Sequence, residues 1–253
     1  MKKPLSLLIP MLSCYLILLS ASVHAEEPDW NGYSALLKAH VQSGEKHGIA
    51  LNLVDYPALA ADPRWPHLLA QLAGFDLEYL NSRQERLVFW INSYNILAMK
   101  TVLDHWPLQS IRDAGGLFSP VWNKPVGVVA GKMRSLHDIE HEILRPMGEP
   151  RIHFAMVCAS VSCPDLRPEA YRVLQLDAQL TDQARIFLAR PNKGLAVKDG
   201  SIRISKIFDW FEDDFSAQGG VISFIRQYRQ DIGLTADHIS YFDYDWSLNG
   251  AAS

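Results

Sequence analysis

The segment Arg151-Ile-His-Phe-Ala-Met-Val-Cys-Ala-Ser-Val-Ser-Cys-Pro164 gathers the residues of this chain that are best suited to chemistry. It contains His153 and two of the three cysteines, Cys158 and Cys163. A cysteine nucleophile needs a base within hydrogen-bond reach and a further group that orients the base. Two cysteines can instead form a disulfide, and a small buried thiol can simply fill the core. The segment therefore predicts a nucleophile, a disulfide or an inert buried pair.

The disulfide alternative demands a turn between the two cysteines. Extended backbone from Cys158 to Cys163 would span ~16 Å, whereas a disulfide allows only ~6 Å between Cα atoms. The intervening Ala-Ser-Val-Ser and the following Pro164 are compatible with such a turn. Both a bridge and a free nucleophile remain open at this point.

The base for Cys158 is expected to come from another part of the chain. We expect the apolar run over 151–158 to form a strand, in which residues an odd number apart point to opposite faces. His153 and Cys158 are five apart, so they would pair only across a bulge or beyond the end of the strand. His141, which follows Glu140 on a predicted amphipathic helix, is the better candidate.

Two asparagines in a predicted buried helix, Asn92 and Asn95, could orient the base or donate to an oxyanion. Buried asparagines more commonly serve as hydrogen-bonded fixtures of a fold. Both interpretations are kept. The candidate catalytic residues are Cys158, His141, His153, Asn92 and Glu140.

A metal site is a weaker alternative. The stretch His137-Asp-Ile-Glu-His141 has the H-x-x-E-H spacing of one class of zinc peptidase, which places two histidines on one face of a helix. A zinc site needs a third protein ligand, and two exposed histidines on an acidic helix explain the pattern without metal. We expect no resident metal and no cofactor.

The amino terminus has the features of a secretory signal peptide. A basic start is followed by an apolar run from Leu5 to Leu19 and by small residues that end at Ala25. The apolar run is shorter than the ~20 residues that a membrane span needs. We expect cleavage after Ala25, a periplasmic or secreted protein, and no transmembrane segment in the mature chain. Such a compartment is oxidising, which favours a bridge between Cys158 and Cys163.

Charge and length limit the partners and the number of domains. Cleavage would remove two of the 24 basic residues and none of the 28 acidic ones, which changes the formal net charge from −4 to −6. An acidic chain is a poor partner for nucleic acid. A peptide or glycan ligand remains compatible with the aromatic residues near the carboxyl terminus. We expect residues 26–253 to form one domain.

Hydrophobic periodicity predicts more helix than strand. Expected helices cover 30–41, 67–73, 84–105, 135–144, 177–188 and 222–228, and expected strands cover 49–56, 126–129, 151–158, 195–197 and 201–204. The helix over 84–105 is apolar nearly all round and should be central. The strands are short and scattered, so we predict an α+β fold with helices packed around a small, mainly antiparallel sheet.

Several blocks together resemble a known family. They are Phe89-Trp-Ile-Asn-Ser-Tyr-Asn95, Ser135-Leu-His-Asp-Ile-Glu-His141, Arg151-Ile-His-Phe154, Val157-Cys-Ala-Ser160, Cys163-Pro164, Trp210-Phe-Glu-Asp-Asp-Phe215 and Tyr244-Asp-Trp-Ser-Leu-Asn249. In this order they resemble the domain of unknown function family numbered 547, over nearly the whole mature chain. The resemblance brings no settled activity with it.

The resemblance implies a set of site residues. The family pattern carries over to Trp90, Asn92, Asn95, Glu140, His141, Arg151, His153, Cys158, Ser160, Cys163, Pro164, Asp214 and Phe215. An acid is more usual at His137, which weakens the zinc interpretation. The leading hypothesis is a thiol-dependent hydrolase or acyl transferase that uses Cys158. Its alternative is a non-catalytic periplasmic binding or interaction module with a structural Cys158 to Cys163 disulfide.

Overall fold

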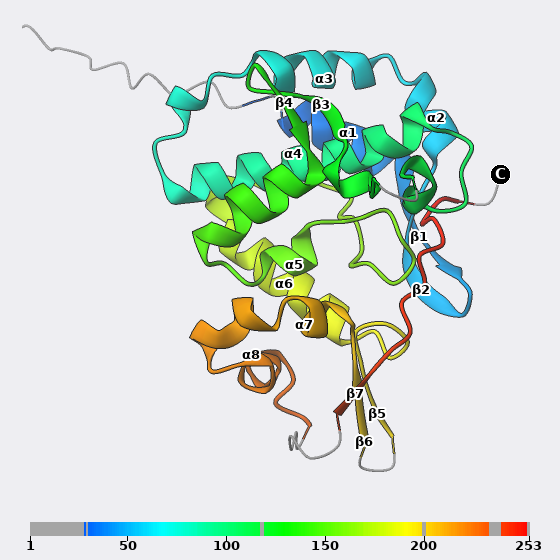
Figure 1. Ribbon diagram of the computed structural model, residues 1–253, viewed down its shortest axis with the longest axis vertical. Helices are drawn as coiled ribbons and strands as arrows, with labels where there is room; N and C mark the ends of the chain where they lie inside the picture. Colours follow the sequence, from blue (N-terminus) through cyan, green and yellow to red (C-terminus); the bar gives the residue numbers. More distant parts are fainter. Residues whose placement is uncertain (1–27, 29, 117–118, 199–200, 233–238, 252–253) are drawn as a thin grey trace, which may run out of the picture.

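The computed structural model describes residue 28 and residues 30–116, 119–198, 201–232 and 239–251 of the chain. The predicted signal peptide, 1–25, lies outside the described residues. The predicted α+β class is confirmed, since helices surround small sheets that are mainly antiparallel. Figure 1 shows the long helix α4 (Arg83–Asp104) running through the middle of the larger part of the molecule.

Helix α4 forms where the sequence predicted it, and its start is fixed by local chemistry. The Ser82 hydroxyl accepts a hydrogen bond from the Glu85 amide at 3.1 Å, and the Glu85 carboxylate accepts one from the Ser82 amide at 2.6 Å. This reciprocal cap satisfies backbone donors that would otherwise lack partners in the first turn. From Leu87 to Met99 every residue is buried, so this helix is the centre of the core.

Most other helices pack around α4 or extend the fold beyond it. The helices before it are α1 (Trp30–His40), α2 (Tyr56–Ala61), α3 (Arg64–Gly74) and the 3₁₀ turn η1 (Leu77–Tyr79). Those after it are η2 (Ile111–Ala114), η3 (Val121–Asn123), the π-helix η4 (Asp138–Leu144), η5 (Arg145–Met147), α5 (Ile152–Ala155), η6 (Val173–Gln175), α6 (Leu176–Leu188), α7 (Ile207–Trp210), η7 (Glu212–Gln218) and α8 (Val221–Tyr228).

The strands form three small sheets. Two are antiparallel hairpins, β1 (Val41–Lys46) with β2 (Ile49–Val54) and β3 (Pro125–Val129) with β4 (Lys132–Ser135). The third pairs β5 (Leu195–Lys198) with β6 (Ser201–Ile204) in antiparallel fashion and adds β7 (Ile239–Tyr241) parallel to β6. The strands predicted over 195–197 and 201–204 are therefore present and pair with each other, and residues 199–200 between them lie outside the described part of the chain.

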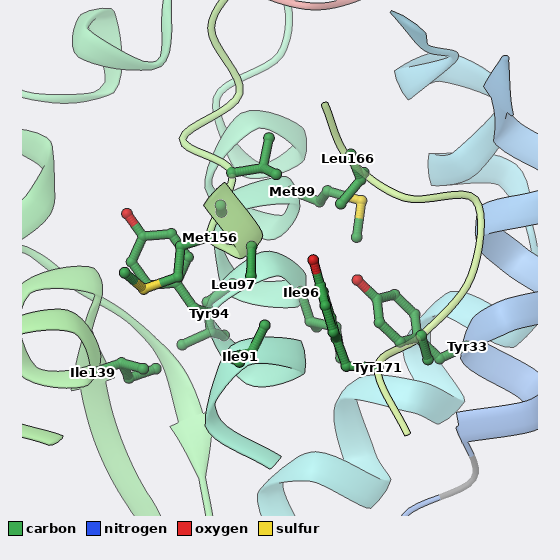
Figure 2. Packing of buried hydrophobic residues seen from close by; sticks show 14 of the residues in the cluster. Tyr33, Ile91, Tyr94, Ile96, Leu97, Met99, Ile139, Met156, Leu166 and Tyr171 are labelled. Atoms are coloured by element: carbon green, nitrogen blue, oxygen red, sulfur yellow. The ribbon is translucent and has the colours of Figure 1, made fainter. Parts of the chain in front are cut away.

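Two clusters of buried side chains make up the core. The larger surrounds α4, and Figure 2 shows Tyr94, Ile96 and Leu97 of this helix within it. The smaller is built from phenylalanines and aliphatic residues of α6, β5, β6, α7, η7 and α8. Helix α5 joins the two, because Ile152 packs in the larger cluster and Phe154 in the smaller one.

The strand predicted over 151–158 is wrong. Residues Ile152–Ala155 form the single-turn helix α5, and the chain becomes extended only at Met156. A short, continuous apolar run buries equally well as a helical turn or as a strand, so its pattern does not decide between them. The periodicity that placed His153 opposite Cys158 therefore does not apply.

The helix predicted over 135–144 also differs in detail. Strand β4 extends to Ser135, whose hydroxyl accepts a hydrogen bond from the Asp138 amide at 3.0 Å. The turns that follow are a π-helix, η4, rather than a regular α-helix. Wide π turns are rare and occur frequently at functional sites. In this protein the π-helix carries Glu140 and His141.

The cap of α4 predicts a measurable loss of stability. Ser82→Ala removes the acceptor for the Glu85 amide, so we expect the free energy of unfolding to fall by about 1 kcal/mol. Urea denaturation followed by circular dichroism measures the change. Ser43→Ala is the matched control, since the Ser43 hydroxyl bonds only at the exposed surface of the first hairpin. Equal losses for the two variants would show that the cap contributes nothing specific.

Candidate active site

A pocket of about 380 Å³ lies between the central helix, the π-helix and the carboxyl-terminal segment. Four of the five candidate catalytic residues line it, namely Glu140, His141, His153 and Cys158. The remaining wall consists of Tyr94, Trp122, Met156, Cys163, Pro164, Ile207, Trp210, Phe211, Tyr244 and Trp246. Figure 2 shows the side chains of Met156 and Tyr94 beside each other within the core.

Asn95 holds the backbone that leads to Cys158. Its amide nitrogen donates to the Ala155 carbonyl at 2.9 Å, and its oxygen accepts from the Val157 amide at 2.8 Å. Asn95 is buried on α4, so both hydrogen bonds form in a low-dielectric setting. Asn95 therefore positions the thiol through the main chain and does not itself line the pocket.

The carboxyl-terminal tail fixes the other side of the cysteine loop. The amides of Val161 and Ser162 donate to the carbonyls of Ser247 and Asp245 at 2.9 and 3.1 Å. Ala159, directly after the nucleophile candidate, has a φ of 57°, which a residue other than glycine rarely adopts. The backbone around Cys158 is thus held in an uncommon conformation by contacts with distant residues.

The loop curls enough to bring the two sulfurs together. Cys158 Sγ lies 2.9 Å from Cys163 Sγ, and both cysteines are free thiols in this structure. Cys158 Sγ also lies 3.2 Å from the Ser160 hydroxyl and 3.4 Å from the Tyr244 hydroxyl. Three hydrogen-bonding groups therefore surround one sulfur.

These neighbours favour a thiolate at Cys158. The hydrogen bond from Cys163 lowers the pKa of Cys158 to about 7, with further help from Ser160 and Tyr244, and outweighs the opposing effect of burial. Burial and the contact with Cys158 raise the pKa of Cys163 well above its ordinary value. A thiolate is the nucleophilic form of cysteine. Of the two sulfurs, Cys158 is consequently the one that ionises more readily, and Cys163 stays protonated beside it.

Glu140 is a buried acid next to the thiol pair. Its carboxylate accepts a hydrogen bond from the Tyr94 hydroxyl at 3.1 Å. Burial raises the pKa of Glu140 to about 7, and the negative charge of Cys158 acts in the same direction. A carboxyl group that titrates near neutral pH can both release and accept a proton there. Glu140 is thus a candidate acid and base for chemistry at Cys158.

The two histidines belong to a separate ionic network. Asp214 accepts a 2.7 Å hydrogen bond from His153 Nε2 and a bidentate pair from Arg145 at 2.6 and 2.8 Å. Arg145 also donates to His141 Nδ1 at 2.8 Å. Burial disfavours a charged Asp214, but the hydrogen bonds from His153 and Arg145 outweigh it and hold the pKa of Asp214 far below its usual range. Asp214 is the anion that organises this network.

The surroundings of both histidines favour their neutral forms. Burial lowers the pKa of His153, although Asp214 opposes this shift. Burial, together with the nearby charges of His137 and Arg145, lowers the pKa of His141. Since Asp214 can only accept, His153 carries its proton on Nε2; since Arg145 can only donate, His141 carries its proton on the other nitrogen, Nε2.

The expected pairing of Cys158 with a histidine is not formed. Among the described residues, the hydrogen-bond partners of the Cys158 sulfur are Cys163, Ser160 and Tyr244, whereas His141 and His153 are engaged by Arg145 and Asp214. The histidines line the same pocket from its π-helix and α5 side. Among the candidate residues, the negative charge of Cys158 acts on the pKa of Glu140.

Asn92 lies outside the pocket. Its side-chain amide donates to the Tyr171 carbonyl at 3.1 Å and accepts from the Tyr171 amide at 3.0 Å. This pair of bonds attaches the chain after the cysteine loop to α4. Asn92 thus has a structural role. Both ends of its side-chain amide are already bonded to the Tyr171 backbone, so it does not orient a base or donate to an oxyanion.

The zinc-like spacing does not assemble a ligand set. The rings of His137 and His141 stack at 4.4 Å between centroids, while Glu140 turns inward toward Tyr94. Within the residues that the structure describes, no group of three histidines, cysteines or acids could hold a metal ion. In the same residues, no helix has the length and apolarity to cross a membrane.

Three residues that the sequence did not single out complete the site, together with Asp214, which the resemblance had included. Tyr244 contacts the Cys158 sulfur, and Arg145 binds Asp214 and His141. Lys193 supports the cysteine loop by donating to the Cys163 carbonyl at 2.8 Å and to Asp165 at 2.7 Å. Tyr244 and Asp214 stand in two of the blocks that carried the family resemblance. That signal pointed to the segments, although not to what the side chains contact.

Comparison with known proteins gives a family match for the central region of the chain. Residues 77–188 match the family model described as "Protein of unknown function, DUF547". This central region of the chain is therefore similar to that family. No curated protein matches the chain, and no solved structure matches it.

The DUF547 region runs from η1 to the end of α6, which is narrower than the mature chain that the resemblance covered. It contains both cysteines and Glu140, His141 and His153. Asp214 and Tyr244, which contact the histidine and the thiol, lie beyond it. The site is therefore completed by a carboxyl-terminal segment that lies outside the region matched by the family model.

The sulfur contacts predict a pH dependence for alkylation. The rate at which iodoacetamide modifies Cys158 should rise through a midpoint near pH 7, the pKa of this thiol, while Cys163 stays nearly unreactive. Cys163→Ala removes the strongest donor to the thiolate, so the midpoint should move up by about one pH unit. Peptide mass mapping over a pH series measures both sites. An unchanged midpoint in the variant would contradict the activation of Cys158 by Cys163.

Proposed function

We propose that this protein is a thiol-dependent hydrolase or acyl transferase in which Cys158 is the nucleophile and Glu140 the acid and base. The observation that carries the proposal is the cluster of three hydrogen-bonding groups around one sulfur, which lowers its pKa to about 7 inside a pocket. A low-pKa thiolate beside a substrate-sized cavity is the arrangement that acyl transfer through cysteine needs.

The first half-reaction forms a thioester. The Cys158 thiolate attacks the carbonyl carbon of a substrate R–CO–X, and the C–X bond breaks as the S–C bond forms. Protonated Glu140 donates its proton to X, which leaves as HX. Glu140 is suited to this step because burial keeps it half-protonated near pH 7. Once Cys158 is ionised, its sulfur can only accept, and the hydrogen bonds from Cys163 and Tyr244 stabilise the thiolate before the attack.

The second half-reaction restores the enzyme. Ionised Glu140 takes a proton from water, or from another acceptor such as an alcohol or amine. The activated oxygen or nitrogen attacks the thioester, and the Cys158 thiolate leaves. Glu140 ends protonated and Cys158 ends ionised, as both began. Asp214 and Arg145 hold the neighbouring histidines in fixed tautomers and keep the pocket wall rigid.

An ester with a good leaving group distinguishes the role of Cys158 as nucleophile from the role of Glu140 as acid and base. With p-nitrophenyl acetate we expect a burst of nitrophenol and an acetyl adduct on Cys158, both absent in Cys158→Ala. Glu140→Gln should keep the burst, since nitrophenolate needs no proton to leave, but should slow steady-state turnover by about 10²-fold or more. Stopped-flow absorbance and intact-protein mass measure these quantities.

The control is the neighbouring acid. Glu142 sits on the same π-helix with its side chain 71% exposed, so Glu142→Gln should turn over normally. Full activity in Cys158→Ala, or equal effects of the two glutamate substitutions, would contradict the proposed mechanism.

The same sulfur pair supports a second candidate, a non-catalytic binding or interaction module with a structural disulfide. The sulfurs lie 2.9 Å apart on a loop that is already curled, so a bond between them requires little movement. We also propose export after cleavage at Ala25, on the basic and apolar pattern of the amino terminus. An oxidising compartment would favour the bridge.

Thiol counting decides between the two candidates. The protein is recovered from its native compartment, denatured, alkylated without reductant and weighed. If Cys158 and Cys163 are both alkylated, the nucleophile is available, as the enzyme proposal expects. If neither is modified until a reductant is added, the resting protein is bridged, and the interaction module becomes the better description.

A further inference from the structure

The outer wall of the pocket is aromatic. Trp210 and Trp246 stack with their rings 5.7 Å apart and 21° from parallel, and Tyr244 lies 4.5 Å from Trp246. Trp122 meets Trp246 edge-on at 5.3 Å. Trp210 is 44% exposed, which is unusual for so large an apolar side chain. Flat rings on several elements thus face one cavity, directly next to the thiol pair.

The pocket offers little to a charged ligand. No lysine or arginine is among the described residues that line it. Two guanidinium groups lie against its wall: that of Arg145 is already bound by both oxygens of Asp214 and donates to His141, and that of Arg112 lies over the Trp246 ring at 5.3 Å. A carboxylate or phosphate beside the thiol pair would lose its water without gaining a cationic partner among the residues that line the pocket, and it would meet Glu140 and the Cys158 thiolate. Anionic substrates are therefore disfavoured.

Polar groups in the pocket are also largely committed to each other. The Tyr94 hydroxyl bonds Glu140, the Tyr244 hydroxyl bonds the Cys158 and Ser160 side chains, and His153 bonds Asp214. A sugar ring would present many hydroxyls to a wall whose hydroxyl groups and Glu140 carboxylate are already engaged, which is costly. An apolar group gains by burial against the rings, and a flat ring gains further from stacking.

We infer that the substrate is a small, uncharged compound whose acyl group carries a flat aromatic ring. The ring lies against Trp210 and Trp246, and the carbonyl carbon reaches Cys158 Sγ. A cavity of about 380 Å³ suits a small molecule rather than a folded protein. This inference rests on the proposed function and narrows its substrate from any acyl compound to an aromatic one.

Three thioesters of one leaving thiol, N-acetylcysteamine, test the inference. Phenylacetyl, acetyl and succinyl groups compare an aromatic, a small and an anionic acyl chain, each rate being divided by the rate with free glutathione. We expect the phenylacetyl thioester to acylate Cys158 about tenfold faster than the acetyl one at low concentration, from burial of the ring. The succinyl thioester should be the slowest. Time-resolved intact mass records the adducts.

Variants show whether the aromatic wall is the cause. Trp210→Ala should reduce the ratio of phenylacetyl to acetyl rates to near one. Tyr79→Ala is the matched control, because Tyr79 is also aromatic, is 49% exposed and lies outside the pocket, and its ratio should match that of the unmodified protein. Equal rates for phenylacetyl and acetyl, or a preference for succinyl, would overturn the inference while the acyl adducts still uphold the proposed function.

If no thioester acylates Cys158, ligand binding still tests the aromatic pocket separately from the proposed thiol-dependent function. Absence of every adduct on a Cys158 that still reacts with iodoacetamide contradicts the proposed function. Phenylacetamide and acetamide are then titrated into the Cys158→Ala variant and followed by tryptophan fluorescence. Tighter binding of phenylacetamide, weakened in Cys158→Ala/Trp210→Ala, upholds the aromatic pocket. Equal affinities for the two amides overturn it.

Discussion

The side-chain amide of Asn95 makes two hydrogen bonds to the backbone, one to the residue before Met156 and one to the residue after it. The position of the Cys158 thiol depends on this pair of hydrogen bonds. Helix α4 is buried along most of its length, so this pair of hydrogen bonds starts from a side chain at the centre of the core. A buried amide with both ends satisfied is stable, whereas either end left unpaired would carry a desolvation penalty. The cysteine loop is therefore placed by the central helix.

Two further attachments define the shape of that loop. Lys193 is almost completely buried and donates to the Cys163 carbonyl and to Asp165. The carboxyl-terminal tail adds backbone hydrogen bonds and brings Tyr244 against the sulfur. In Figure 1 this tail runs from β7 alongside the rest of the fold toward the β1 and β2 hairpin. The loop is held from three directions, which permits the positive φ at Ala159.

Charge in the pocket is arranged in two groups with Glu140 between them. One group is the thiol pair, in which hydrogen bonding stabilises a single negative charge. The other is Asp214, whose charge is balanced by Arg145 and which also accepts a hydrogen bond from His153. Burial raises the pKa of Glu140 to about 7, and the charges of Cys158, Arg145 and Asp214 also act on this pKa. Because Glu140 and Cys158 interact, their titrations belong to the pair. The aromatic wall limits water around these groups and strengthens their interactions.

Local sequence determined the elements that carry the site. The nearly continuous apolar character of residues 84–105 predicted α4, the pattern also predicted the two strands that pair as β5 and β6, and helical spacing predicted α6 within one residue. The short apolar run before Cys158 and the π turns of η4 were not predictable, since their patterns fit more than one backbone conformation.

The membership of the pocket was also largely visible in the sequence, whereas its pairings were not. Cys158, Glu140, His141 and His153 were recognised from residue type and family resemblance, and they do share one cavity. Tertiary structure alone decided that Cys158 meets Tyr244, 86 residues away, and that His153 meets Asp214, 61 residues away. Periodicity reports which face of an element is buried; it carries no information about which distant side chain will be packed against that face.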